Sequence, residues 1–272
     1  PPSPHFSSPN PSAALAAPMA AGLRAVLAGA WLAGQPLDRE WSLALNSGLS
    51  AWPTFWSFLT WSGLGACGFL LVCACSAREP RRVAGLLVAL VVGGLVVHAL
   101  KRTLQVERPL AVFGADHDVF SVIGESLHKG SMPSGHSATA WAVAGLLVLS
   151  ESRAAVWRHL WWVLAAGQAL SRIVVGAHWP SDVLVGSGLG AMLAPFVWRL
   201  GVTGRISRWM HRSEARLVMA GGLPVWGLVL CLSDLGWHLP AWVIGGVMAL
   251  SLWGAWRWWL SAQQPSGQEG SA

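Results

Sequence analysis

Long apolar runs without charged residues alternate with short polar segments along most of this chain. A helix needs about 20 apolar residues to cross the hydrocarbon core of a bilayer. Five runs come close to that length, and three more are shorter or less uniform. The five are 54–77, 83–100, 183–198, 217–233 and 240–256, and the three are 20–34, 137–150 and 156–170. The pattern predicts an all-α fold, a polytopic membrane helical bundle with six to eight spans.

The other segments divide the chain into a membrane domain and its flanks. We find no internal repeat and no interdomain linker, so residues 19–200 are interpreted as one membrane domain. Residues 1–18 are rich in proline and serine, and we predict that they and the tail 261–272 are disordered. Because Met19 resembles a biological start, we also expect residues 1–18 to be dispensable for activity. Residues 201–216 are predicted to be a basic, helical cytoplasmic connector beside anionic headgroups, and 217–260 a C-terminal transmembrane hairpin.

Composition supports a membrane protein, and charge predicts its orientation. Only 11% of the residues are charged, against about 25% in a soluble domain. The net charge of +6 could indicate a nucleic-acid partner, but the basic residues lie mainly in short loops, as in the cytoplasmic loops of membrane proteins. With eight spans and a cytoplasmic N-terminus, twelve of the 18 basic residues are cytoplasmic: Arg24, Arg78, Arg81, Arg82, Arg153, Arg158, Arg199, Arg205, Arg208, Arg212, Arg216 and Arg257. We therefore expect a lipid bilayer, and no nucleic acid, as the partner.

Three polar segments stand out on the opposite side of the membrane. They are KRTLQVERP at 101–109, PSGH at 133–136 and SRIVVGAHWPSD at 171–182. From residue 136 the chain crosses the membrane, turns at 151–155 and crosses back, so the span count places all three at the same face. The long loop between the first two segments is of a size that is often functional, and we expect residues 110–132 to influence substrate choice.

The second and third segments carry groups suited to binding and attacking an anion. Ser134 and Gly135 open a helix, whose free backbone N–H groups attract anions, and Ser134 can cap that helix or donate its hydroxyl. His178 and Asp182 are four residues apart at the start of another helix. The aspartate can therefore accept the proton of one imidazole nitrogen and leave the other as a nucleophile.

Three cations complete this set of residues. Lys101, Arg108 and Arg172 would surround an anion with several equivalent oxygens, and phosphate fits that description. Two histidines and an aspartate could instead bind a metal, but the three cations would repel it. The charges could also be simple interfacial anchors, although anchors require no fixed spacing.

The spacing of these residues resembles a known signature. It is Lys101-x6-Arg108-Pro109, then Pro133-Ser134-Gly135-His136, then Ser171-Arg172-x5-His178-x3-Asp182. This resembles, in order and without departure, the three-part signature of the type-2 phosphatidic acid phosphatase superfamily. The resemblance covers roughly residues 40–200.

The resemblance also implies a role for each residue. His178 would attack phosphorus and form a phosphohistidine, with Asp182 orienting it. His136 would protonate the leaving oxygen and later act as the base toward water. The phosphoryl oxygens would be held by Lys101, Arg108, Ser134, the Gly135 backbone and Arg172. No metal and no other cofactor is implied.

The resemblance implies an integral membrane phosphatase that acts on a lipid phosphate or pyrophosphate. Undecaprenyl pyrophosphate, phosphatidylglycerophosphate and phosphatidic acid are candidate substrates. We expect a core of six spans plus the C-terminal hairpin, in a bacterial inner membrane with the site facing the periplasm. Two alternatives remain: a phosphotransferase with the same site, acting for example on lipid A, and a non-enzymatic lipid-binding or transport protein.

Overall fold

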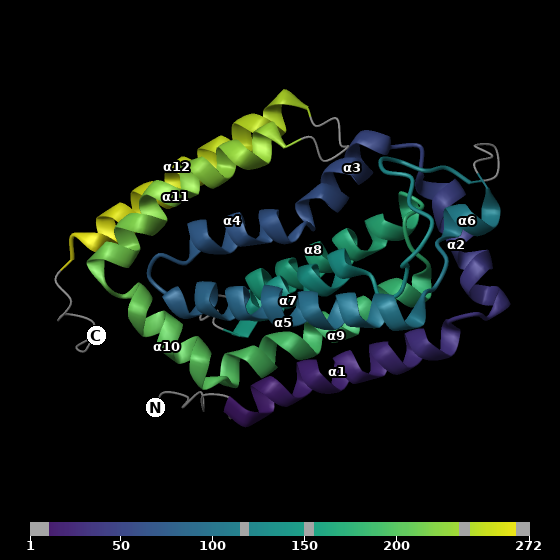
Figure 1. The fold of residues 1–272 in the computed structure, drawn as a ribbon, viewed down its shortest axis with the longest axis horizontal. Helices are drawn as coiled ribbons and strands as arrows, with labels where there is room; N and C mark the ends of the chain where they lie inside the picture. Colours follow the sequence, from purple (N-terminus) through teal and green to yellow (C-terminus); the bar gives the residue numbers. More distant parts are fainter. Residues whose placement is uncertain (1–10, 115–119, 150–154, 234–239, 265–272) are drawn as a thin grey trace, which may run out of the picture.

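The computed structural model describes residues 11–114, 120–149, 155–233 and 240–264, which form helices and no strand (Figure 1). The helices are α1 Pro11–Leu32, α2 Pro36–Leu49, α3 Pro53–Ser62, α4 Gly65–Cys75, α5 Pro80–Leu104, α6 Pro109–Phe113, α7 Gly135–Leu149, α8 Ala155–Val174, α9 Pro180–Arg199, α10 Gly201–Met210, α11 Ser213–Leu232 and α12 Ala241–Ala262. Six of them begin at a proline, whose fixed φ suits the first turn of a helix. The predicted all-α membrane bundle is confirmed.

The eight predicted apolar runs all fall on helices. By length and composition, α1, α9, α11 and the α5 segment can each cross a membrane, and the bent pair of α3 and α4 can form a fifth, broken span. The apolar helix α7 has only 15 residues. With 20 and 22 residues, α8 and α12 are long enough, but arginine and several tryptophans make them less apolar.

The run 54–77, predicted as one span, is two helices, α3 and α4, bent by 65°. Gly63 is the C-cap of α3, and α4 begins at Gly65. Glycine disfavours a helix interior by about 1 kcal/mol relative to alanine. The prediction of one continuous span is therefore wrong at its centre, because two glycines in three residues favour a break there.

Helix α1 begins at Pro11, so the predicted disorder of residues 1–18 is wrong for residues 11–18. The stretch after Pro11 is rich in alanine, the strongest helix former, and this outweighs the prolines nearby. Residues 1–10 lie outside the described part of the chain. Farther along, Gly188 of α9 approaches the Gly22 carbonyl of α1 so closely that a side chain there would collide with it. This contact fixes α1 against α9.

The basic segment 201–216 is largely helical, as predicted, and forms α10 and the first turn of α11. Arg205 and Arg208 are exposed, but Arg216 is buried. Arg216 donates a hydrogen bond to the Ser261 carbonyl of α12 and lies 3.1 Å from Nδ1 of His211. It therefore joins α11 to α12, and is not available to bind headgroups as we predicted for the connector. Because α12 continues to Ala262, the first two residues of the predicted disordered tail are helical, and residues 265–272 are not described.

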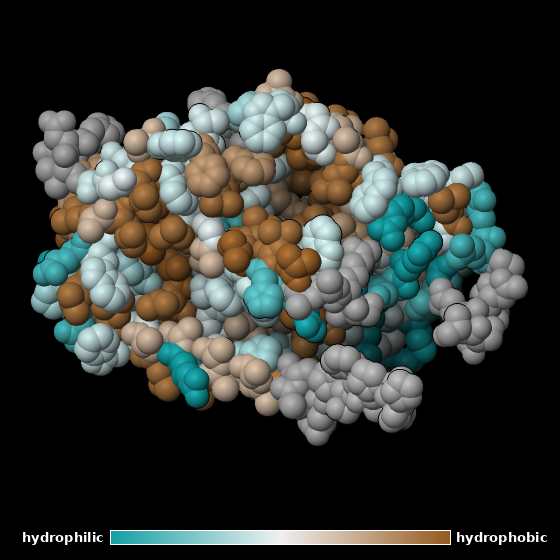
Figure 2. Space-filling model, turned by 180° about the vertical axis from the view of Figure 1, so that it is seen from behind, coloured by the Kyte–Doolittle hydropathy of each residue, from teal (hydrophilic) through white to brown (hydrophobic). Residues whose placement is uncertain are grey.

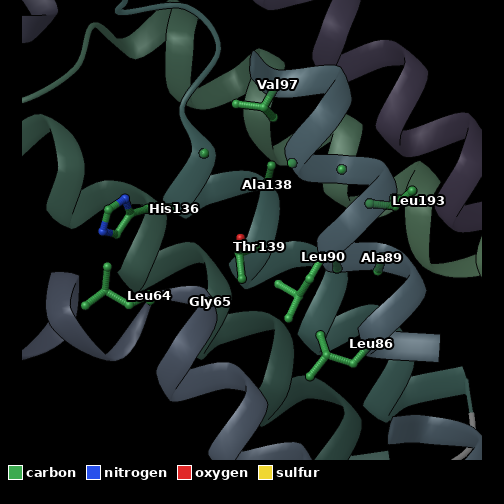
Figure 3. A pocket seen from close by; sticks show the side chains of 15 residues that line it. Leu64, Gly65, Leu86, Ala89, Leu90, Val97, His136, Ala138, Thr139 and Leu193 are labelled. Carbon is green, nitrogen blue, oxygen red and sulfur yellow. The ribbon is translucent and has the colours of Figure 1, made fainter. Parts of the chain in front are cut away.

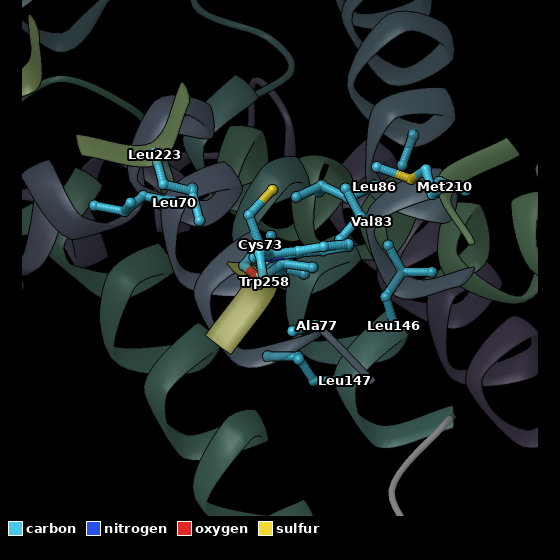
Figure 4. Close-up of a cluster of buried hydrophobic side chains, with 14 of the residues drawn as sticks. Leu70, Cys73, Ala77, Val83, Leu86, Leu146, Leu147, Met210, Leu223 and Trp258 are labelled. Atoms are coloured by element: carbon cyan, nitrogen blue, oxygen red, sulfur yellow. Dashed lines mark hydrogen bonds between the residues drawn. The ribbon is translucent and has the colours of Figure 1, made fainter. Parts of the chain in front are cut away.

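The hairpin of α11 and α12 packs on α4 (Figure 4). Trp258 is fully buried and donates from Nε1 to the Cys73 carbonyl at 2.8 Å. Gly254 lies directly against Ala74, where a side chain would clash. Since Leu223 belongs to the same core cluster, the hairpin is an integral part of the bundle.

The motif-bearing segments lie at one end of the bundle. Helix α1 begins and α12 ends at the opposite end, where α10 also lies (Figure 1). Figure 2 shows hydrophilic residues concentrated at the α10 end of the rear face and apolar residues over its middle. Helices α2 and α6 lie at the motif end (Figure 1).

Candidate active site

The structure brings the three sequence motifs together from several helix ends. The residues are Lys101 at the end of α5, Arg108 before α6, Ser134, Gly135 and His136 at the start of α7, Arg172 at the end of α8, and His178 and Asp182 at the start of α9. Direct contacts join these segments. Nη1 of Arg108 lies 3.4 Å from Nε2 of His178. The backbone N–H of Ser134 donates to the Asp182 carbonyl at 3.0 Å.

His178 and Asp182 form a buried pair at the start of α9. Nδ1 of His178 lies 3.2 Å from Oδ2 of Asp182, whose side chain is completely buried. The same oxygen accepts the Trp179 backbone N–H at 2.9 Å and the Ser131 hydroxyl. The bond from Trp179 is the return half of a capping box, which follows from an aspartate in the first turn of a helix. Asp182 thus directs the Nδ1 proton of His178, which leaves Nε2 unprotonated beside Nη1 of Arg108.

The surroundings keep His178 neutral. Burial lowers the pKa of His178 well below its usual value, and the positive charges of Arg108, Arg172 and Lys101 lower it further. A neutral imidazole has an unprotonated nitrogen, which nucleophilic attack requires. Since Nδ1 faces Asp182, that nitrogen is Nε2, on the side of Arg108.

Backbone carbonyls hold Arg108 and Lys101 in place. Arg108 donates to the Lys129 carbonyl at 3.0 Å and to the Ala177 carbonyl at 2.8 Å. Lys101 donates to the carbonyls of Gly130 and Ser131. These bonds fix the directions of both side chains without neutralising them. The loop before α7 thus orients two cations, while residues 115–119, part of the predicted substrate-selecting loop, lie outside the described residues.

Arg172 is a third cation, buried at the end of α8. Only 4% of its surface is exposed, and its Nη1 donates to the Thr60 hydroxyl of α3. Its Nε–H has no partner among the described residues. A buried donor without an acceptor is costly, so this N–H is suited to receive an anion.

His136 joins the polar site to an apolar cavity. It lies in the first turn of α7, and its Nε2 is buried without a partner among the described residues. The cavity has a volume of about 190 Å³ and is lined by residues of α4, α5, α7 and α9 together with the break before α4 (Figure 3). His136 and Gly135 are among its lining residues. Leu86, Leu90 and Leu193 are among the apolar ones (Figure 3). Any group at His136 therefore has an apolar space beside it.

Ser134 and Gly135 shape the start of α7. The Ser134 hydroxyl accepts hydrogen bonds from the hydroxyl of Ser137 at 2.9 Å and from its backbone N–H at 3.4 Å, so it caps the helix, which is one of the two roles considered for it. Binding of a phosphoryl oxygen by Ser134 stays a prediction. A side chain at Gly135 would contact only Val97, so packing does not require glycine there. Glycine adds no side chain of its own over the first backbone N–H groups of α7, which lack partners within the helix. Gly186 of α9 presses against the Ser134 backbone, which joins α7 to α9.

These observations describe a pocket for an anion. The described residues include no carboxylate paired with Lys101, Arg108 or Arg172, so their charges are available to a ligand. A helix N-terminus adds partial positive charge from its backbone. An anion held here would lie next to Nε2 of His178.

Comparisons with known proteins indicate the family of this chain. A family model described as PAP2 superfamily matches residues 82–206. Decaprenylphosphoryl-5-phosphoribose phosphatase of Mycobacterium tuberculosis is 35% identical over 170 residues, which are 61% of this chain and 84% of that protein. The chain belongs to the PAP2 superfamily.

Two further similarities concern a second relative and a solved structure. Lipid A 1-phosphatase of Rhizobium johnstonii is 34% identical over 170 residues, which are 60% of this chain and 67% of that protein. The crystal structure of Aquifex aeolicus LpxE covers 61% of this chain and 98% of its own, with a TM-score of 0.55 and 24% identity. The structural match establishes a shared fold. The chain is thus a multi-pass membrane protein whose similar PAP2 relatives are phosphatases acting on lipid phosphates.

Sequence reasoning missed two residues that support this candidate site. Thr60 binds Arg172 from 112 positions away, within an apolar run that gives no sign of a polar role. Ser131 donates its hydroxyl to Asp182 and stands only two residues before the PSGH motif. Proximity to the motif could have indicated Ser131, whereas only a tertiary structure identifies Thr60.

Proposed function

We propose that this protein is an integral membrane phosphatase that hydrolyses a lipid phosphate through a phosphohistidine at His178. The observation that carries the proposal is the contact chain from Asp182 to His178 to Arg108, which directs a neutral Nε2 toward a group of unneutralised cations. Phosphoryl transfer depends mainly on positioning and on stabilising the charge of the equatorial oxygens. The site provides both.

In the first step, the phosphoryl oxygens lie between Lys101, Arg108, Arg172 and the first N–H groups of α7. Nε2 of His178 forms a bond to phosphorus while the bond from phosphorus to the ester oxygen breaks. Burial and the three cations favour neutral His136 in the free site, so the negative charge of the bound phosphate is needed for its protonation. The resulting imidazolium gives its proton to the departing oxygen. The Nδ1 proton of His178 stays in its hydrogen bond with Asp182, which stabilises the positive charge that develops on the ring.

In the second step, neutral His136 accepts a proton from water as the water oxygen attacks phosphorus. The bond from phosphorus to Nε2 of His178 breaks, and inorganic phosphate leaves. His136 is then an imidazolium again, ready for the next cycle. Over the two steps His136 gives up one proton and takes up another, and neither step needs a metal. The three cations around the site would repel a metal ion, and the described residues contain no group of three or more His, Cys, Asp or Glu side chains able to hold one.

The cavity beside His136 supports a lipid as the leaving group. The acid that protonates the leaving oxygen must lie next to it, and the space next to His136 is apolar. A hydrocarbon chain attached to that oxygen would enter the cavity between α5 and α7. A fully water-soluble ester would leave this space unfilled.

The charge distribution supports a periplasmic site in a bacterial inner membrane. The arginine-rich α10 lies at the end of the bundle opposite the site (Figure 1), and positive loops are retained in the cytoplasm. The relatives are bacterial proteins. The substrates to compare are undecaprenyl pyrophosphate, phosphatidylglycerophosphate and phosphatidic acid, together with lipid A and the phosphoribosyl lipid named by the relatives.

The test is release of inorganic phosphate from this panel by purified protein in mixed micelles, without a lipid acceptor. We expect release from at least one lipid, inhibition by orthovanadate and no loss of activity with EDTA. His178→Ala should abolish release, whereas His98→Ala, which alters an exposed histidine on α5, should not. Full activity of His178→Ala would refute the proposal.

A phosphotransferase is the second candidate, because the same residues could pass the phosphoryl group from His178 to a lipid hydroxyl. It would release phosphate only slowly until an acceptor lipid is added. A lipid-binding or transport role would instead leave the cellular function of His178→Ala intact.

A further inference from the structure

Helix α2 turns a polar stripe toward the protein. Asp38, Ser42 and Asn46 are spaced by four residues and share one face, and all three are buried. Trp41 and Leu37, on the other side, are 50% and 40% exposed. This polarity is the reverse of that in a helix of a soluble protein, so the polar side chains must find their partners inside the bundle.

Asp38 binds the start of the helix that carries Asp182. Its Oδ1 accepts the Ser181 backbone N–H at 2.9 Å, and its Oδ2 accepts the Ser181 hydroxyl at 2.5 Å. The first N–H groups of a helix lack partners within the helix, and a carboxylate is the preferred acceptor there. Asp182 accepts the hydrogen bond of the Trp179 N–H, and Asp38 accepts that of the Ser181 N–H, the next one available. Two carboxylates thus fix the first turn of α9.

Asn46 holds the other side of the nucleophile segment. Its side-chain amide donates to the Val174 carbonyl at 2.7 Å and to the Ser121 carbonyl at 2.8 Å. Its Oδ1 accepts the Ser121 N–H at 2.8 Å. Val174 ends α8 two residues after Arg172. Helix α2 therefore binds the chain on both sides of the segment that contains His178.

Packing alone does not hold Asp38 and Ser181 together. A cavity of about 210 Å³ lies beside them, lined also by Gln35, Met132 and Trp179. Without the hydrogen bonds, the first turn of α9 has space into which it can shift. The position of Asp182 then depends on the Asp38 carboxylate.

We propose that Asp38 is a positioning residue for catalysis, which acts through Ser181 to keep Asp182 and His178 aligned. The inference rests on the proposed function, since the aligned group is the nucleophile of that reaction. The Asp38 carboxylate accepts its hydrogen bonds from Ser181 and not from a cation of the site, so it governs attack by His178 more than binding of the phosphoryl group.

The test compares Asp38→Asn and Asp38→Ala with Glu40→Gln, which alters an exposed carboxylate on the same helix. We expect kcat to fall about 10-fold in Asp38→Asn and about 100-fold in Asp38→Ala, with KM within about twofold of wild type. Glu40→Gln should match wild type in both constants. A fall in kcat in Glu40→Gln equal to that in Asp38→Ala, or unchanged kcat in Asp38→Ala, would overturn the proposal.

A binding measurement separates positioning from a loss of structure and needs no turnover. Orthovanadate can bind the cations as inorganic phosphate does, and it gains a further bond to Nε2 when the histidine is aligned. Asp38→Ala should therefore lose the additional thermal stabilisation by vanadate but keep stabilisation by phosphate. Equal loss of both would overturn the inference. Wild-type protein that binds both anions but releases no phosphate from any lipid would contradict the proposed function alone.

Discussion

Arg172 provides a sharp test of how the buried cations are aligned. Its Nη1 is held by the Thr60 hydroxyl of α3, and its Nε–H has no partner among the described residues. Thr60→Val keeps the shape of the side chain but removes the acceptor. Arg172→Lys keeps the charge but cannot bind Thr60 and a phosphoryl oxygen with one planar group.

The expected loss of kcat/KM for each substitution follows from the hydrogen bonds that it removes. A hydrogen bond that involves a charged group contributes about 1.5–3 kcal/mol, and about 1.4 kcal/mol is a factor of ten. Thr60→Val should therefore lower kcat/KM by about 10-fold, and Thr60→Ser should restore most of it. Arg172→Lys loses a second charge-assisted bond, to the substrate, and should lower kcat/KM by about 10²- to 10³-fold.

A double-mutant cycle on phosphate release then tests the mechanism. If Thr60 acts only through Arg172, adding Thr60→Val to Arg172→Lys should change kcat/KM by less than about threefold. Thr103→Val, which removes an exposed hydroxyl bonded only within α5, serves as the control and should leave kcat/KM unchanged. Fully additive effects of the two substitutions would refute the argument that Thr60 positions Arg172.

Three further predictions concern the nucleophile, the cavity and the hairpin. Because the pKa of His178 is lowered, the imidazole stays neutral as pH falls from about 7 to 6. Single-turnover formation of phosphoenzyme should therefore persist over this range, and a loss of phosphoenzyme centred near pH 6.5 would contradict the prediction. Gly94 lines the cavity and has open space around it. Gly94→Phe should therefore lower kcat/KM for a long-chain lipid at least about 10-fold and leave kcat/KM for p-nitrophenyl phosphate unchanged. The control Gly221→Phe should change neither value. Equal loss on both substrates would count against a chain site. Trp258 is fully buried, so Trp258→Ala should lower the free energy of unfolding in detergent by about 3–5 kcal/mol, and Trp256→Ala, with its side chain 55% exposed, by much less.

The convergence of the three motifs was predictable from the sequence for a topological reason. An apolar run long enough to be a span fixes the face on which the next polar segment emerges. The runs between Lys101 and Asp182 therefore placed all three motifs at one end of the bundle, as the structure has them. The pairing of His178 with Asp182 also followed from their spacing, because residues four apart share a helix face.

The elements that hold the motifs in place could not be predicted in the same way. Helix α2 has 14 residues and mixed polarity, so it gives no span signal. Its polar stripe faces inward, toward its partners Ser181 and Val174. These partners lie more than 100 residues away in the sequence, so no local pattern predicts the contacts. The bend between α3 and α4 depends on two glycines that a hydropathy pattern counts as apolar.

The arrangement of α5 and α7 implies that chain binding and catalysis are coupled. Helix α5 supplies Lys101 at its end and Leu90 to the cavity, and α7 supplies His136 to both. The Ser134 N–H bonds to the Asp182 carbonyl, so the start of α7 is joined to the nucleophile segment. A chain that fills the cavity would therefore stabilise the same helices that position the proposed acid and the proposed phosphate-binding residues. Binding energy from a remote part of a substrate then appears in kcat as well as in KM, so shortening the lipid chain should lower both the affinity and the rate of the chemical step.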